Sequence, residues 1–135
     1  MKQTLKPGLE GSAQITVDAE RVTRHLGDDL GVYATPALLR DIEHTCHELL
    51  RPHLDQGEGS VGTHIELQHL APTLQGARVS VQARVTAVDR RAVTFSVSVQ
   101  DEQEELARCS HGRFVVETAK LKQRLAAKAA ALRGD

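Results

Sequence analysis

The stretch RVSVQARVTAVDRRAVTFSVSVQ, residues 78–100, decides the fold, because apolar and polar side chains alternate along both of its halves. Such alternation is typical of a strand with one face in a core and the other in water. Between the halves, DRRA at residues 89–92 replaces the pattern with charged residues. The stretch therefore predicts two antiparallel strands joined by a tight turn. The predicted core-facing residues are Val79, Val81, Ala83, Val85, Ala87, Val93, Phe95, Val97 and Val99.

Three further strands are predicted around this pair. Downstream, LARCSHGRFVV (106–116) reads as a last long strand. Upstream, GEGSVGTHIELQHLAP (57–72) runs from a glycine-rich turn into a segment that alternates from Thr63 onward, and SAQITVDA (12–19) alternates near the N-terminus. Consecutive strands joined by short turns predict an antiparallel meander with one packed face.

One long helix is predicted before the meander, in TPALLRDIEHTCHELLRPHL (35–54). Thr35 is the expected N-cap, Pro36 suits the first helical position, and Pro52 ends the helix. An apolar stripe at helical spacing is broad enough to lie against a sheet. Its residues are Leu38, Leu39, Ile42, Cys46, Leu49 and Leu50.

The remaining segments complete a single predicted α+β domain over residues 1–135. ERVTRHLGDDLGVYA (20–34) lacks steady periodicity and is predicted to be a loop or lid, and 118–135 is predicted to be a helical tail. One helix cannot cover both faces of a five-strand sheet or close its edges. The sequence therefore predicts a hotdog fold, a curved antiparallel sheet around one central helix, with a second copy pairing edge to edge as a homodimer, or as a tetramer.

Composition excludes several classes of partner. The 135 residues carry a formal net charge of -1 and only 2% aromatic residues, which argues against a nucleic-acid partner. The sequence has no apolar stretch approaching the roughly 20 residues of a membrane span, and its N-terminus does not resemble a secretory signal. Cys46 and Cys109 form no disulfide framework. A cytoplasmic protein is expected.

Two apparent ligand motifs are set aside. The turn GEGSVG (57–62) lacks the ending of a phosphate-binding loop and leads into a strand rather than a helix. His44 and His47 stand three residues apart on the predicted helix, with Cys46 beside them, but spacing indicates no third ligand. Neither a metal nor a cofactor is expected.

Three polar residues stand in places that catalysis could use. A hydroxyl at a helix start, here Thr35, has free backbone N–H groups nearby. Glu43 lies beside the apolar stripe, where desolvation would raise the pKa of its carboxyl, and His69 replaces the third inward-facing apolar residue of its strand. The alternatives are that Thr35 only caps, that Glu43 faces water and that His69 is a hydrogen-bonded core residue.

Three stretches resemble a known family. TRHL (23–26), LDQGEGSVGTHIELQH (54–69) and SHGRFVV (110–116) resemble segments of the fluoroacetyl-CoA thioesterase group of hotdog-fold acyl-CoA thioesterases. The resemblance runs from about Val22 to the tail. It implies a homodimeric enzyme that hydrolyses an acyl-CoA to a carboxylic acid and free CoA.

The family's catalytic set is a threonine, a glutamate eight positions later and a histidine twenty-six positions after that. In this chain those spacings fall on Thr35, Glu43 and His69. The resemblance also implies that the Gly62 amide lies near the thioester oxygen and that Arg113 binds substrate. His111 matches another polar position of the last strand.

The resemblance breaks down in the lid. The segment GDDLGVYA (27–34) is shorter than the family's lid and lacks its pair of phenylalanines, so selectivity for fluoroacetyl groups is not implied. Tyr33 is the candidate to fill part of that space. Cations that CoA phosphates could use, but that a solvated surface equally explains, are Arg90, Arg91, Lys120, Lys122 and Arg124.

Several alternatives stay open. Glu43 could attack the thioester or activate water. Eight helical residues separate two side chains by about 12 Å and about 80°, so Thr35 should precede the helix, or the set is completed across two subunits. The competing functions are a non-catalytic acyl-thioester binding module and a hotdog enoyl-CoA hydratase, although the hydratase's Asp/His pair is not evident.

Overall fold

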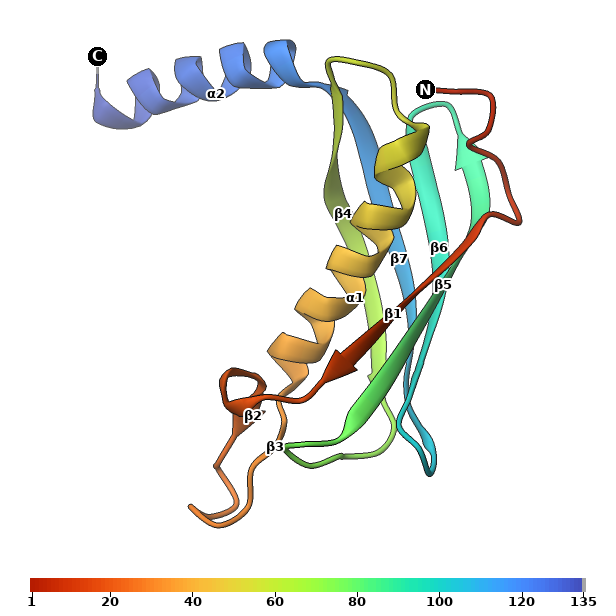
Figure 1. Ribbon diagram of the computed structural model, residues 1–135. Helices are drawn as coiled ribbons and strands as arrows, with labels where there is room; N and C mark the ends of the chain where they lie inside the picture. Colours follow the sequence, from red (N-terminus) through yellow and green to blue (C-terminus); the bar gives the residue numbers. More distant parts are fainter. Residues whose placement is uncertain (135) are drawn as a thin grey trace.

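The computed structural model describes residues 1–134 and confirms the predicted α+β architecture. A five-stranded antiparallel sheet, in the order β1-β5-β6-β7-β4, curves around one long helix, α1 (Figure 1). The strands are β1 (Glu10–Thr16), β4 (Glu58–His69), β5 (Arg78–Asp89), β6 (Ala92–Gln100) and β7 (Glu105–Glu117), and the helices are α1 (Thr35–Leu50) and α2 (Thr118–Arg133). This is the hotdog arrangement.

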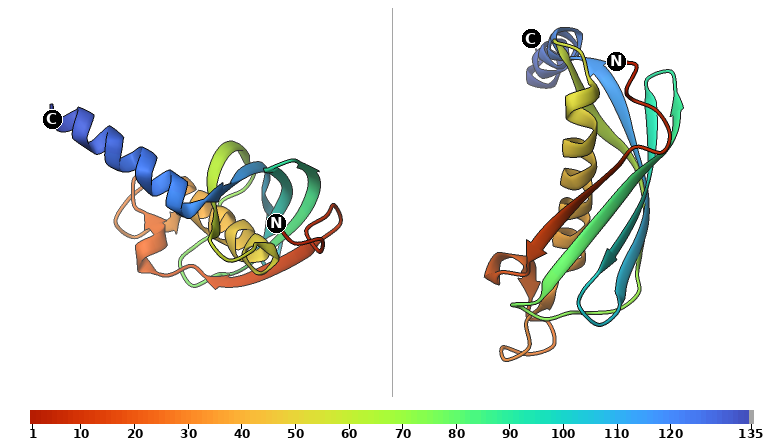
Figure 2. Two further views of the ribbon diagram at one scale, coloured as in Figure 1. Left: turned by 90° about the horizontal axis from the view of Figure 1, so that it is seen from above. Right: turned by 45° about the vertical axis from the view of Figure 1, so that its right-hand side comes forward.

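The core lies between α1 and the concave face of the sheet (Figure 2). From α1 it takes Leu38, Ile42, Cys46 and Leu50, all fully buried. Each buried aliphatic side chain contributes about 1.5–3 kcal/mol relative to an exposed one. The alternating residues of β5 and β6 face this stripe as predicted, with one exception. Ala87 is exposed, because a register shift between Val85 and Ala87 reverses the alternation.

A second register shift shapes β4, which lies at the edge of the sheet beside β7. It falls between Gly62 and His64 and leaves Thr63 as an extra residue. An extra residue reverses which side chains face the core. Gly62 therefore lies on the face toward α1, and so do Ile65, Leu67 and His69. Without the shift, Gly62 and His69 would lie on opposite faces of the sheet.

The segment before α1 differs from its prediction. A short 3-10 helix (Ala19–Arg21) leads into this segment, and a two-stranded hairpin follows, made of β2 (Val22–Thr23) and β3 (Val32–Tyr33). We call the hairpin the lid. The predicted N-cap is wrong. Ala34 occupies the cap position without a side-chain hydrogen bond, and Thr35 is the first helical residue. Thr35 is thus free to use its hydroxyl elsewhere.

The bounds of β7 and of the two helices differ slightly from the predicted ones, and β7 is one residue longer at each end than the predicted strand 106–116. α1 ends at Leu50, and a 3-10 turn (Arg51–His53) follows it at Pro52. The predicted tail 118–135 is α2, while Asp135 lies outside the described residues. No helix within residues 1–134 is both long and apolar enough to cross a membrane.

Candidate active site

The first candidate cluster joins the start of α1 to the end of β4. The Thr35 hydroxyl and the His69 ring are hydrogen-bonded, with 2.8 Å between Oγ1 and Nδ1. Because Nδ1 is engaged by the hydroxyl, the other ring nitrogen, Nε2, is left for a substrate or a water molecule. Two of the three predicted catalytic residues therefore meet within one chain, at its lid end. We call them the Thr35–His69 pair.

The second cluster lies further along the same face and contains Glu43. Arg113, which is 5% exposed, places Nη1 3.5 Å from Oε2 of Glu43. The same guanidinium donates to the Ser60 hydroxyl at 2.9 Å and to the Ser60 carbonyl at 3.1 Å. Burial lowers the pKa of Arg113, and the Glu43 carboxylate acts in the opposite direction. A guanidinium held on three sides is a rigid support for the carboxylate.

Gly62 is required by the position of Glu43. A Cβ on Gly62 would come within 3.0 Å of the Glu43 carboxylate oxygen and would also lie 3.3 Å from the Glu43 Cδ and 3.4 Å from the His111 Cε1. Any side chain here would displace the carboxylate. The Glu43 carboxylate thus lies against Gly62, the residue whose backbone amide the family resemblance implies as the oxyanion donor. We call Glu43, Gly62, His111 and Arg113 the Glu43 cluster.

His111 has a defined tautomer. Its Nδ1 lies 2.8 Å from the His64 carbonyl, which can only accept, so Nδ1 carries the proton. Its Nε2 then accepts from Nη1 of Arg113 at 3.3 Å. The ring is fully buried, and burial lowers its pKa. His111 is thus a neutral acceptor that helps to orient Arg113, a role that sequence reasoning left undefined.

The Glu43 side chain is more exposed than its place beside the apolar stripe of α1 predicts. Its side chain is 46% exposed in the single chain, so the desolvation expected from its place beside the apolar stripe is not found there. Neighbouring Cys46 is fully buried, and burial raises the pKa of its thiol to about 12. A thiol that stays protonated near neutral pH is not a nucleophile. Cys46 is therefore not a candidate nucleophile beside Glu43.

A third group of side chains fastens the lid to α1. Arg21 donates to both carboxylate oxygens of Asp41, at 2.9 and 3.0 Å, and the Tyr33 hydroxyl also donates to this carboxylate. Burial, and the negative charge of Asp41, raise the pKa of Tyr33. Sequence reasoning missed this group, although Asp41 stands among the stripe residues of α1, where a charge needs a partner.

The cations considered for CoA phosphates are partly committed to other partners. Arg91 lies 3.2 Å from Glu58 and 3.6 Å from Glu117, and Lys120 lies 3.2 Å from Glu117. These contacts tie the β5–β6 turn to the start of β4 and the end of β7, and the start of α2 to the end of β7.

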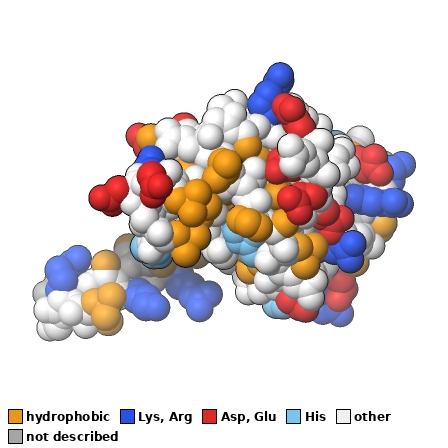
Figure 3. Space-filling view, turned by 90° about the horizontal axis from the view of Figure 1, so that it is seen from below, with side chains coloured by type: hydrophobic (Ala, Val, Ile, Leu, Met, Phe, Trp, Pro, Cys, Tyr) orange, Lys and Arg blue, Asp and Glu red, His pale blue; other side chains and the backbone are white. Residues whose placement is uncertain are grey.

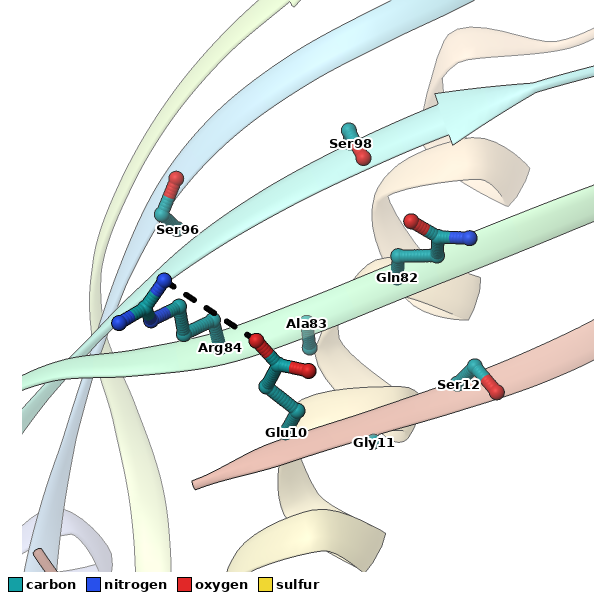
Figure 4. Close-up of a pocket in the computed structure, with 8 residues that line it drawn as sticks. All are labelled: Glu10, Gly11, Ser12, Gln82, Ala83, Arg84, Ser96 and Ser98. Atoms are coloured by element: carbon teal, nitrogen blue, oxygen red, sulfur yellow. Dashed lines mark ion pairs between the residues drawn. The ribbon is translucent and has the colours of Figure 1, made fainter. Parts of the chain in front are cut away.

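A hollow on the other, outer face of the sheet offers less chemistry (Figure 4). Its lining includes one long ion pair, 4.0 Å between Arg84 and Glu10, both of them exposed. Its eight lining residues contain no histidine or cysteine. Polar side chains of β1, β5 and β6 make up most of it, namely Glu10, Ser12, Gln82, Arg84, Ser96 and Ser98. The face toward α1 is the stronger candidate site.

The chain is similar to known thioesterases over most of its length. The model of a family described as fluoroacetyl-CoA-specific thioesterase matches residues 17–119. The fluoroacetyl-CoA thioesterase of Streptantibioticus cattleyicolor is 29% identical over 135 residues, covering 95% of this chain and 97% of its own length.

Two solved structures extend the comparison. A mutant of the fluoroacetyl-CoA thioesterase FlK in complex with acetyl-CoA is 27% identical, with a TM-score of 0.83 and coverage of 92% of this chain and 98% of that one. A thioesterase superfamily member from Thermus thermophilus has a TM-score of 0.90 at 24% identity, covering 98% of this chain and 99% of its own. The second likeness bears on the fold alone.

Proposed function

This chain belongs to the fluoroacetyl-CoA-specific thioesterase family and is a thioesterase, and we propose that it hydrolyses an acyl-CoA through Thr35, Glu43 and His69. The products are a carboxylic acid and free CoA. One observation carries the assignment of residues: the Thr35–His69 hydrogen bond and the Arg113–Glu43 ion pair both lie on the sheet face that packs against α1. A mutant of a relative was solved with acetyl-CoA, which supports a CoA thioester as substrate.

The set is completed across two subunits. Thr35 and Glu43 are separated by eight residues of regular helix, about 12 Å along α1, which is too far for one thioester carbon to meet both groups in a single chain. β4 is an edge strand with unpaired N–H and C=O groups, and such an edge is a template for a second chain. Antiparallel pairing of two β4 strands about an axis near Ile65 sets His69 of one copy opposite Gly62 of the other. Each Thr35–His69 pair then meets the Glu43 cluster of the other copy.

The assembled site has a role for each group. The thioester carbonyl is directed at the Gly62 amide, and the nearby Arg113 guanidinium adds positive charge where the oxyanion forms. Glu43 either attacks the carbonyl carbon, giving a mixed anhydride that water then opens, or removes a proton from an attacking water molecule. When the C–S bond breaks, His69 delivers a proton to the departing CoA sulfur. Thr35 holds the His69 ring in orientation.

The dimer also accounts for the exposure of Glu43. A carboxylate that is 46% exposed in one chain becomes buried once a second copy covers the β4 edge. Removal of water strengthens every electrostatic interaction inside the site. The proposed enzyme is therefore active as a homodimer and inactive as a single chain.

Release of free thiol from a panel of acyl-CoAs, short to long and aliphatic to aryl, tests the proposal. We expect turnover on one class of acyl group and a loss of about 10²–10⁴-fold in kcat for Glu43→Gln. Glu48→Gln is the matched control, because Glu48 is an exposed carboxylate on the same helix and pairs with Arg51. Acyl-CoA binding without thiol release would instead identify a non-catalytic binding module.

A further inference from the structure

The C-terminal helix α2 has almost no support within its own chain. No residue of Thr118–Arg133 is buried, and Leu125 and Leu132 are 53% and 79% exposed. With Leu121 and Ala129 they lie on one stripe, at the spacing that marks an apolar helix face. An isolated helix of this length is only marginally stable in water. An exposed apolar stripe on such a helix indicates a missing partner.

The direction of α2 shows where that partner lies. Figures 1 and 2 show α2 leaving the end of β7 and extending past β4, one of the two edge strands of the sheet. Sixteen helical residues span about 24 Å, or about five times the spacing between neighbouring strands. The helix therefore occupies the space into which a second copy must come if two β4 strands pair.

The opposite end of β4 carries a matching surface. Four leucines there are 39–72% exposed, and apolar side chains gather on this end of the molecule (Figure 3). Backbone hydrogen bonds between the lid and residues 73–75 hold the two leucine-bearing segments side by side. We call this surface the lid-end face, and its leucines are Leu26, Leu30, Leu70 and Leu74.

The charges of the two surfaces are complementary. Residues 118–134 contain no acidic residue. Asp28 and Asp29 stand between two of the leucines of the lid-end face. The basic residues of α2 are Lys120, Lys122, Arg124, Lys128 and Arg133. Opposite charges beside the two apolar patches favour docking of α2 on the lid-end face. They disfavour contact between two α2 helices or between two lid-end faces.

We propose that α2 is an arm that docks its leucine stripe on the lid-end face of a second copy of this chain. Because paired β4 strands run antiparallel, the Glu58 end of one copy lies beside the His69 end of the other. The arm that leaves the first copy there reaches the lid of the second. It holds that lid down and forms an outer wall over the Thr35–His69 pair. The inference rests on the homodimer under the proposed function.

Two full-length variants with equal added charge test the arm. Leu125→Glu with Leu132→Glu places two carboxylates on the stripe, whereas Gln123→Glu with Ala127→Glu places them on the opposite face of α2. The measurement is hydrogen exchange of lid amides 22–33, followed by mass spectrometry at a concentration where the protein is dimeric. We expect the stripe variant to exchange at least about tenfold faster in the lid and the control to match the wild type.

The outcomes separate the arm from the proposed function. Equal lid exchange in the stripe variant and the wild type overturns the arm, whatever the thiol-release assay shows. A wild type that is monomeric at tens of micromolar also overturns it. Faster lid exchange in the stripe variant alone, with the dimer mass retained through β4, supports the arm even if no acyl-CoA in the panel is hydrolysed.

Discussion

Gly62→Ala is the most informative single substitution, because it adds one methyl group against the Glu43 carboxylate. The backbone at Gly62 is not in the left-handed region, so alanine fits the strand and the effect is confined to the side chain. The added Cβ would come closer than 3.0 Å to a carboxylate oxygen, a separation that Cβ atoms essentially never show. In the single chain Glu43 is half exposed, so its carboxylate can swing away while the chain folds. The variant should therefore fold.

The size of the effect follows from that displacement. Restoring an ordinary contact of 3.4–4 Å moves the carboxylate oxygen by more than about 1 Å, and a misplacement of about 1 Å already costs about 10²-fold in rate. This corresponds to about 2.7 kcal/mol of activation free energy. The loss should appear in kcat rather than KM, because the carboxylate acts on the thioester during the reaction and not as an anchor for CoA.

Thiol release from the best acyl-CoA, with urea unfolding in parallel, measures the effect. Gly59→Ala is the control on the same strand, since its Cβ would meet only the Thr118 hydroxyl, at an ordinary 3.4 Å. In a Glu43→Ala background, Gly62→Ala should add no further loss, because no carboxylate remains to be displaced. A folded Gly62→Ala protein with wild-type kcat would refute the reasoning, and so would an equal loss for Gly59→Ala.

Substitutions at three further residues probe the groups around the site. Thr35→Ser should keep most of kcat, whereas Thr35→Ala should lower kcat about tenfold, which is the effect of losing one hydrogen bond to His69. Equal thiol-release rates for the two variants would contradict the role of Thr35 in holding the His69 ring. Burial lowers the pKa of His111 from 6.5, so below pH 6.5 the folded state binds fewer protons than the unfolded state. The contribution of His111 to stability is therefore fully present above that pH and is lost as the pH falls. His111→Gln should make the free energy of unfolding, measured with urea at pH 5–7, less dependent on pH. An unchanged dependence on pH would contradict the assignment of His111 as a neutral ring. Asp41→Asn should lower the free energy of unfolding by about 2 kcal/mol and speed proteolysis in the lid, whereas a change within error would mean that the lid is held by other contacts.

Periodicity was sufficient to predict the sheet and the long helix. The alternating residues of 79–85 and 93–99 and the stripe of α1 are local signals, and they face the core as expected apart from Leu39, which is only half-buried and is not packed against the core. The register shifts were not predictable in the same way. They depend on how β4 fits against β7, and Gly62, Thr63 and His64 carry no unambiguous mark of an extra residue.

Some features of the site could be predicted from the spacing of residues in the sequence, whereas others depend on contacts that only the folded chain makes. The Thr35–His69 hydrogen bond lies where the family spacing predicts it, although the cap position was wrong by one residue. The role of Arg113 as a brace for Glu43 needs the fold, because fifty-one positions separate Ser60 from His111, and both contact the guanidinium. The catalytic roles stay predictions.

The central claim is that each active site combines Glu43 of one subunit with Thr35 and His69 of the other. Mixed dimers test this claim most directly. A His69→Ala chain and a Glu43→Gln chain with different affinity tags are co-expressed, and the mixed dimer is isolated. One of its two sites then combines the intact Glu43 of the first chain with the intact Thr35–His69 pair of the second. We predict about half the wild-type rate of thiol release, although each homodimer is inactive. A mixed dimer as inactive as its parents would contradict a site shared between subunits.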